Sequence, residues 1–147
     1  MNVGVLASHE GTTLQSLLDA FAGGHLPGRV SVVVSNNGDS GALLKARQAG
    51  VHAVRLSSRT HPDPAMLDAA IREGLVAAGV DVVFLAGYMK KLGPVVLGTF
   101  RGRILNTHPA LLPRFGGRGM YGDRVFEAVL DAGEAESGVS IHLVDRE

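Results

Sequence analysis

Short valine- and leucine-rich runs alternate along the chain with segments whose apolar residues recur at helical spacing. Leu14, Leu17, Leu18 and Phe21, for example, follow the i, i+3, i+4, i+7 spacing of one helical face. Six runs are predicted to be strands, over Asn2–Ala7, Arg29–Ser35, Val51–Leu56, Asp81–Ala86, Arg103–His108 and Val139–Val144. Five helices are predicted between them, one capped by Thr12 or Thr13 and ended by Gly23, the others over Ser40–Ala49, Ala65–Ala78, Pro94–Phe100 and Asp123–Ala132.

This alternation predicts an α/β fold: a single Rossmann-like, doubly wound, mostly parallel sheet with helices on both faces, joined by right-handed crossovers. A length of 147 residues fits one domain, and no linker or repeat divides the chain. We therefore expect a single domain over residues 1–147. Because the last predicted strand lies so close to Glu147, we also expect a C-terminal stretch beyond that residue in the natural protein.

The composition excludes several classes of protein. The chain has no cysteine, which removes disulfides and thiolate metal sites, and its six histidines form no metal-ligand pattern, so we expect no metal. Fourteen basic residues balance fourteen acidic ones, which argues against nucleic acid or an anionic membrane as a partner. No apolar run reaches the ~18 residues of a membrane span, and the first residues do not form a signal peptide. We expect a cytoplasmic monomer or homodimer that acts on small molecules.

The sharpest chemical signal is the run Asn106–Pro113, which contains an Asn-x-His-Pro sequence. Successive strand side chains alternate between faces, so Asn106 and His108 point the same way. Pro109 ends the strand and places the pair at its carboxyl end, where ligands bind in open α/β sheets and where we expect His108 to be exposed. An amide can stabilise the oxyanion that develops from a carbonyl, and an imidazole can protonate it. The alternative is a pair of polar residues that only hydrogen-bond the loop.

A second signal is the turn Gly11-Thr12-Thr13, which follows the first strand and opens the first helix. Free backbone N–H groups and the helix dipole make such a turn an anion site. Gly11 would let a ligand approach the backbone closely, and the two threonine hydroxyls add donors. The turn carries neither the G-x-G-x-x-G fingerprint nor the Walker lysine. The alternative is an ordinary capped helix start.

A third signal is the loop Leu85–Pro94, which follows the fourth strand and faces the same sheet edge as His108. Met89 and Leu92 could wall a flat aromatic ligand, and Lys90 and Lys91 could meet its carboxylates. The alternative is apolar anchoring of the loop beside two solvated lysines.

The last predicted strand contributes a further histidine. Ser140 and His142 share one face by alternation, whereas Asp145 is expected on the opposite face. A histidine in such a strand is more often a hydrogen-bonded core residue than a catalyst. We keep His142 as a third catalytic candidate beside Asn106 and His108.

Together these segments resemble the folate-dependent formyltransferases. The run Asn106–Pro113 is similar to the signature of that family, and the segments Gly11–Thr13, Leu85–Met89 and Gly116–Asp123 resemble the members that act on glycinamide ribonucleotide. The resemblance extends from Met1 to Glu147. It implies transfer of a formyl group from 10-formyltetrahydrofolate to the amine of glycinamide ribonucleotide in purine biosynthesis, without a metal.

The resemblance also implies residue roles. The ribonucleotide phosphate would lie on Gly11, Thr12 and Thr13; the folate would lie against Met89, Lys90, Lys91 and Leu92; Asn106 would contact the formyl donor, and His108 would donate the proton. Two departures stand out. The family's folate-contacting arginine aligns with Pro62–Pro64, and its catalytic aspartate would fall just beyond Glu147.

Two other classes of function remain open from the sequence. A 10-formyltetrahydrofolate deformylase or a methionyl-tRNA formyltransferase would share the Asn-x-His pattern, although the balanced charge does not favour a tRNA partner. If the chain truly ends at Glu147, a non-catalytic nucleotide-binding module is the other alternative.

Overall fold

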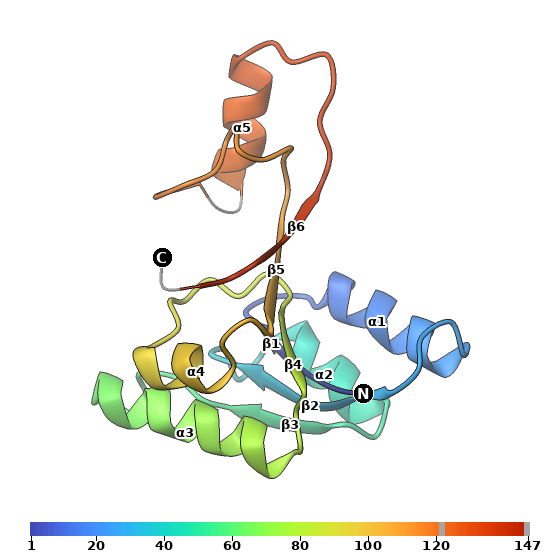
Figure 1. The fold of residues 1–147 in the computed structure, drawn as a ribbon, viewed down its shortest axis with the longest axis vertical. Coiled ribbons are helices and arrows are strands. Elements are labelled where there is room, and N and C mark those ends of the chain that lie inside the picture. Colours follow the sequence, from blue (N-terminus) through green and yellow to red (C-terminus); the bar gives the residue numbers. More distant parts are fainter. Residues whose placement is uncertain (121–122, 146–147) are drawn as a thin grey trace.

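The computed structural model describes residues 1–120 and 123–145. Six strands form one sheet in the order β3-β2-β1-β4-β5-β6 (Figure 1). They are β1 (Asn2–Ala7), β2 (Arg29–Ser35), β3 (His52–Arg55), β4 (Val82–Leu85), β5 (Ile104–His108) and β6 (Ser140–Leu143). The five strands β1 to β5 pair in parallel, and β6 pairs antiparallel with β5. The predicted mostly parallel sheet is confirmed, and the structure identifies β6 as the strand that departs from the pattern.

Helices cover both faces of the sheet, as predicted. They are α1 (Thr12–Ala22), α2 (Gly41–Gln48), α3 (Pro64–Ala77), α4 (Pro94–Thr99) and α5 (Asp123–Asp131). Leu14 of α1 and Leu43 of α2 are fully buried in the cluster on one face, with Val33 of the sheet. Leu75 of α3 and Phe100 beyond α4 are buried in the cluster on the other face. Apolar burial on both sides explains why β1 and β2 read as continuous valine-rich runs.

The order of the strands reverses at β1, inside the sheet. The chain winds from β1 through β2 to β3 in one direction and then returns to β4 and β5 on the other side of β1. In open α/β sheets, ligands bind outside the carboxyl ends of the strands where the order reverses. The loops that follow β1, β2, β3 and β4 all emerge at this edge, as the parallel pairing requires.

The C-terminal part projects from the layered part. Figure 1 shows β5 and β6 leading to α5, which stands apart from the other helices. We call residues 109–120 and 123–145 the outer region. Its apolar cluster contains only Ala110, Val125 and Val129 as buried residues, with Phe115 and Met120 packed against them. Among the residues that the structure describes, no helix has the length and apolar character needed to cross a bilayer.

Candidate active site

Asn106 and His108 lie on the sheet face that α3 and α4 cover. Ile104, Asn106 and His108 are alternate residues of β5, so their side chains share one face of the sheet. Ile104 packs against Val96 and Phe100, which shows that this is the face covered by α3 and α4. Asn106 is half-buried, whereas His108 is only 8% exposed. The expectation that His108 is exposed at the strand end was therefore wrong, because the loop after β5 folds back over the ring.

The ring of His108 is held by that loop. Its Nε2 lies 2.7 Å from the backbone oxygen of Phe115, a residue with a left-handed φ of 57°. A carbonyl can only accept a hydrogen bond, so Nε2 carries a proton. Nδ1 has no hydrogen-bond partner among the described residues. In the doubly protonated ring, Nδ1–H is thus the donor left for a substrate.

His142 is directly opposite Asn106 in the antiparallel pair of β5 and β6. Nδ2 of Asn106 donates to Nε2 of His142 at 3.2 Å, and Nδ1 of His142 is 3.2 Å from the oxygen of Leu143. These two contacts are consistent with a neutral ring protonated at Nδ1. Such a ring would orient the Asn106 amide rather than take part directly.

Ser140 connects the strand to the loop after β5. It is opposite His108, donates to the oxygen of Ala110 at 2.7 Å, and accepts from the N–H of Leu112 at 3.0 Å. The sequence had placed Ser140 on this face without a role. In the structure, its hydroxyl holds the backbone segment that closes over the histidine.

The turn after β1 has the geometry of an anion site, and Gly11 also has a packing role that the sequence did not predict. Gly11 is the residue that caps α1, with φ 76°, and no side chain caps the helix. Thr12 and Thr13 are its first two helical residues, so neither is the cap that we predicted. A Cβ on Gly11 would be 2.8 Å from Cα of Ala42 in α2. Glycine is therefore required by helix packing and by its left-handed backbone.

The loop between β4 and α4 is fixed at its first half by Ser8, which is 1% exposed at the end of β1. The hydroxyl of Ser8 accepts from the N–H of Met89 at 2.8 Å and donates to Oδ1 of Asn36 at 2.6 Å. The loop ends at α4, and Asp68 of α3 holds the first turn of that helix by accepting from the N–H groups of Val95 and Val96. We call the segment Gly87–Gly93 the β4–α4 loop.

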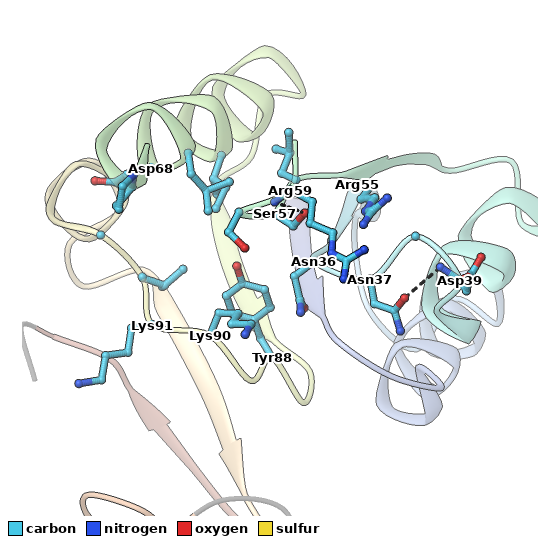
Figure 2. Close-up of a pocket in the computed structure, with 18 residues that line it drawn as sticks. Asn36, Asn37, Asp39, Arg55, Ser57, Arg59, Asp68, Tyr88, Lys90 and Lys91 are labelled. Atoms are coloured by element: carbon cyan, nitrogen blue, oxygen red, sulfur yellow. Dashed lines mark hydrogen bonds between the residues drawn. The ribbon is translucent and has the colours of Figure 1, made fainter. Parts of the chain in front are cut away.

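A cavity of about 870 Å³ opens on one side of this loop, and we call it the cationic hollow. Arg55 at the end of β3 and Arg59 in the segment after it line the cavity, and Lys90 and Lys91 belong to its loop wall (Figure 2). Among the described residues, none of these four cations forms an ion pair. Figure 2 shows that Lys91 points away from the cavity. From the sequence, a role was assigned to the two lysines, and Arg59 was noted near the family's folate-contacting arginine without being given that role.

Tyr88 projects into the cationic hollow toward Ser57 (Figure 2). Burial raises the pKa of its phenol, because the charged phenolate would be poorly solvated there. Tyr88 is thus a neutral hydrogen-bonding group at physiological pH.

A second cavity, of about 930 Å³, lies on the other side of the loop against α4. We call it the α4 hollow. Its apolar walls come from Leu92, Leu97 and Val144, and Arg101 and Asp145 add charges. The strand β6 ends at Leu143, so alternation does not extend to Asp145, which lines the same hollow as Val144. The expectation that Asp145 lies on the opposite face was wrong for this reason.

Of the four loop residues expected to line a folate site, three line these cavities. Lys90 and Lys91 line the cationic hollow, and Leu92 lies between the two and lines both. Met89 lines neither and is 38% exposed.

Asp68 is the residue that sequence reasoning missed. It is 5% exposed, on the buried face of α3 together with Ile71 and Leu75. The spacing i, i+3, i+7 of Asp68, Ile71 and Leu75 was the available signal, because it places a carboxylate in an apolar stripe. Among the described residues, no group of three or more His, Cys, Asp or Glu side chains could hold a metal ion.

Comparison with known proteins adds to this geometry. The family model described as formyl transferase matches residues 1–147. The chain is 36% identical over 145 residues to the phosphoribosylglycinamide formyltransferase of Haemophilus influenzae, covering 99% of this chain and 66% of that protein. It is 35% identical to the Escherichia coli protein of the same name, covering 100% and 67%. The crystal structure of glycinamide ribonucleotide transformylase 1 from Symbiobacterium toebii matches with a TM-score of 0.90 at 42% identity, covering 98% and 66%. The chain thus spans about two thirds of the length of these relatives.

Proposed function

Because the chain belongs to the formyl transferase family, we propose that its protein transfers a formyl group from 10-formyltetrahydrofolate to the amine of glycinamide ribonucleotide. Bacterial relatives of 35–36% identity are named phosphoribosylglycinamide formyltransferase. The observation that carries the proposal is the arrangement of Asn106, His108 and His142 on one face at the carboxyl end of β5. An amide donor and a proton donor side by side suit a reaction that develops an oxyanion.

The chemistry of the transfer follows from these groups. The ribonucleotide amine attacks the formyl carbon, and the carbonyl oxygen becomes an oxyanion. Asn106 donates from its amide, and protonated His108 donates from Nδ1, because Nε2 is held by the Phe115 carbonyl. The amine then loses a proton, the bond from the carbon to the tetrahydrofolate nitrogen breaks, and that nitrogen takes up a proton.

His142 acts in this scheme as a positioning residue. Its Nε2 accepts from the Asn106 amide, which fixes the direction of the amide plane. This assignment changes the role that the sequence suggested, from a group in the chemistry to a group that orients Asn106.

The two hollows suit the two ends of a folate. Apolar walls at Leu92, Leu97 and Val144 fit the flat ring system, and Asp145 offers an acceptor for its amino groups. Lys90 would meet the carboxylates of the glutamate portion on the other side of the loop. Val144 packs against the cluster that contains Ile104, and Ile104 shares a face of β5 with Asn106, so a ring in the α4 hollow would lie on that face.

The turn after β1 would hold the phosphate of the ribonucleotide. Gln15 N–H bonds to the oxygen of Gly11, but the earlier N–H groups of Thr12, Thr13 and Leu14 have no hydrogen-bond acceptor among the described residues. Three adjacent donors at a positive helix end are suited to a phosphate. Thr12 is exposed and Thr13 half-buried, so a ligand can reach both.

The experiment is a formyl-transfer assay of the natural protein that carries this chain, with both substrates, following tetrahydrofolate release. We expect release to depend on glycinamide ribonucleotide and to saturate with it. Equal release without the ribonucleotide would instead indicate a deformylase, in which water replaces the amine. Absence of both reactions, with ribonucleotide binding retained, would favour a binding module.

A further inference from the structure

We propose that Asp68 is a positioning residue for folate binding, which acts by capping α4 from a neighbouring helix and so fixes the β4–α4 loop. The inference rests on the proposed function for the identity of the ligand. Oδ2 of Asp68 accepts from Val95 N–H at 2.8 Å, and Oδ1 accepts from Val96 N–H at 3.1 Å. A carboxylate at a helix N-terminus gains both from charge-assisted hydrogen bonds and from the helix dipole.

The helix α4 has no cap of its own. Gly93 occupies the capping position and offers no side chain, and Pro94 has no N–H to satisfy. Leu97 N–H already bonds to the Gly93 oxygen. Val95 and Val96 are therefore the two residues of the first turn whose N–H groups need an outside acceptor, and both find it in Asp68.

The glycine and the aspartate are matched to each other. A Cβ on Gly93 would overlap with the carboxylate of Asp68, so any larger residue there would displace that carboxylate. Gly93 has φ −82° and ψ 171°, an extended conformation that any residue adopts. The glycine is therefore required by the space that Asp68 occupies, and not by its backbone conformation.

The position of Asp68 links this cap to the ligand. Asp68 lines the cationic hollow, and the loop it fixes carries Lys90 on that side and Leu92 between both hollows. Ser8 anchors the loop only as far as Met89. Without Asp68, residues 90 to 93 would keep no polar anchor at the helix end, and the walls shared by the two hollows would lose their fixed spacing.

The test is a compensation experiment in the natural protein that carries this chain. Asp68→Ala should raise KM for 10-formyltetrahydrofolate about tenfold, from the loss of hydrogen bonds to a charged group, and leave KM for the ribonucleotide unchanged. Gly93→Ser alone should also raise KM for the folate, because its side chain collides with the carboxylate. The double variant Asp68→Ala/Gly93→Ser should restore KM for the folate to within about threefold of the wild-type value, because serine at the capping position accepts from the same two N–H groups.

A matched control and a second measurement separate the possible failures. Asp81→Ala removes a carboxylate that accepts from Asn2 N–H at 2.8 Å near the opposite edge of the sheet, and it should leave both KM values unchanged. Amide hydrogen exchange of residues 88–92 should be faster in Asp68→Ala and slow again in the double variant. This measurement does not require the protein to be active. If the wild-type protein transfers no formyl group, the proposed function fails. Hydrogen exchange in the single and double variants still tests whether Asp68 caps α4 and fixes the loop. If Asp68→Ala lowers Tm but changes neither folate KM nor loop exchange, or if the double variant is worse than either single one, the inference is overturned.

Discussion

The layered part of the molecule and the outer region are stabilised in different ways. In the layered part, two large clusters bury whole side chains such as Leu43 and Leu75 from opposite faces of the sheet. In the outer region, Leu130 is 78% exposed and Ile141 63% exposed. Beside its small apolar cluster, that region has polar contacts, including those of the Ser140 hydroxyl and the ion pair of Arg114 with Glu134.

This contrast separates the part of the molecule that supplies stability from the part that carries the proposed chemistry. Apolar burial contributes ~25 cal/mol per Å², so most of the folding free energy comes from the layered part. The proposed reactive residues lie where the two parts meet, with Asn106 and His108 on β5 and His142 on β6. Residues at this boundary should therefore change turnover, and residues inside the layered part should change stability.

The largest expected effect is on turnover in His108→Ala. Loss of the proton donor should lower kcat by ~10²–10⁴-fold, measured by steady-state formyl transfer. Because His108 also hydrogen-bonds the Phe115 oxygen, thermal unfolding should be recorded in parallel. A folded His108→Ala protein with nearly normal kcat would remove this residue from the mechanism.

Asn106→Ala should lower kcat by ~10²–10³-fold, which is typical of losing one oxyanion donor. His142→Ala should have a smaller effect on kcat, because Asn106 would keep its amide and lose only the contact that orients it. The comparison of the two variants under saturating substrate is the measurement. A His142→Ala defect as large as that of Asn106→Ala would restore a direct catalytic role to the histidine.

Leucine substitutions test the stability of the two parts directly. Leu43→Ala removes a fully buried side chain from the layered part and should cost ~2–5 kcal/mol in unfolding free energy. The matched variant Leu130→Ala alters a 78% exposed leucine in the outer region and should stay within ~0.5 kcal/mol. Denaturant unfolding measures both. Equal losses would show that the outer region contributes as much burial as the layered part.

Gly11→Ala tests whether packing or ligand access requires the glycine in the turn after β1. The new methyl group would meet the backbone of Ala42, so we expect ~1–3 kcal/mol of overpacking beyond the cost of the left-handed conformation. Gly24→Ala is the control, since Gly24 has φ 73° and no other heavy atom within 4 Å of the added Cβ. Similar losses of unfolding free energy in the two variants would contradict the packing explanation.

The smallest effect concerns alkaline stability. The pKa of Tyr88 is raised by burial, so above pH ~10 the unfolded chain releases the phenol proton before the folded protein does. The folded state then binds more protons, and unfolding free energy falls as pH rises toward the folded pKa. Tyr88→Phe should remove this part of the fall, measured by urea unfolding from pH 9 to 11. An unchanged pH slope would mean that Tyr88 does not titrate differently in the two states.

Local sequence patterns were sufficient to predict the helices and strands, the fold class and the main candidate residues. Helical periodicity and valine-rich runs depend on local geometry and burial, which is why all six strands and five helices were found with small changes at their ends. Strand alternation was also enough to place Asn106 and His108 on one face. The aspartate expected beyond Glu147 stays a prediction, and Tyr121, Gly122 and Glu147 lie outside the described residues.

Contacts between segments that are distant in the sequence could not be predicted from local patterns. The His108 ring hydrogen-bonds the backbone oxygen of Phe115 in the loop that buries it. Ala42 leaves no room for a side chain at Gly11. Ser8 and Asp68 hold the two ends of the β4–α4 loop. Hydrophobic periodicity within one helix or strand carries no information about these contacts, because each involves groups from different segments. Steric exclusion and hydrogen-bond satisfaction act between atoms that are close in space, so the reason for a glycine or a buried carboxylate becomes visible only when the chain is folded.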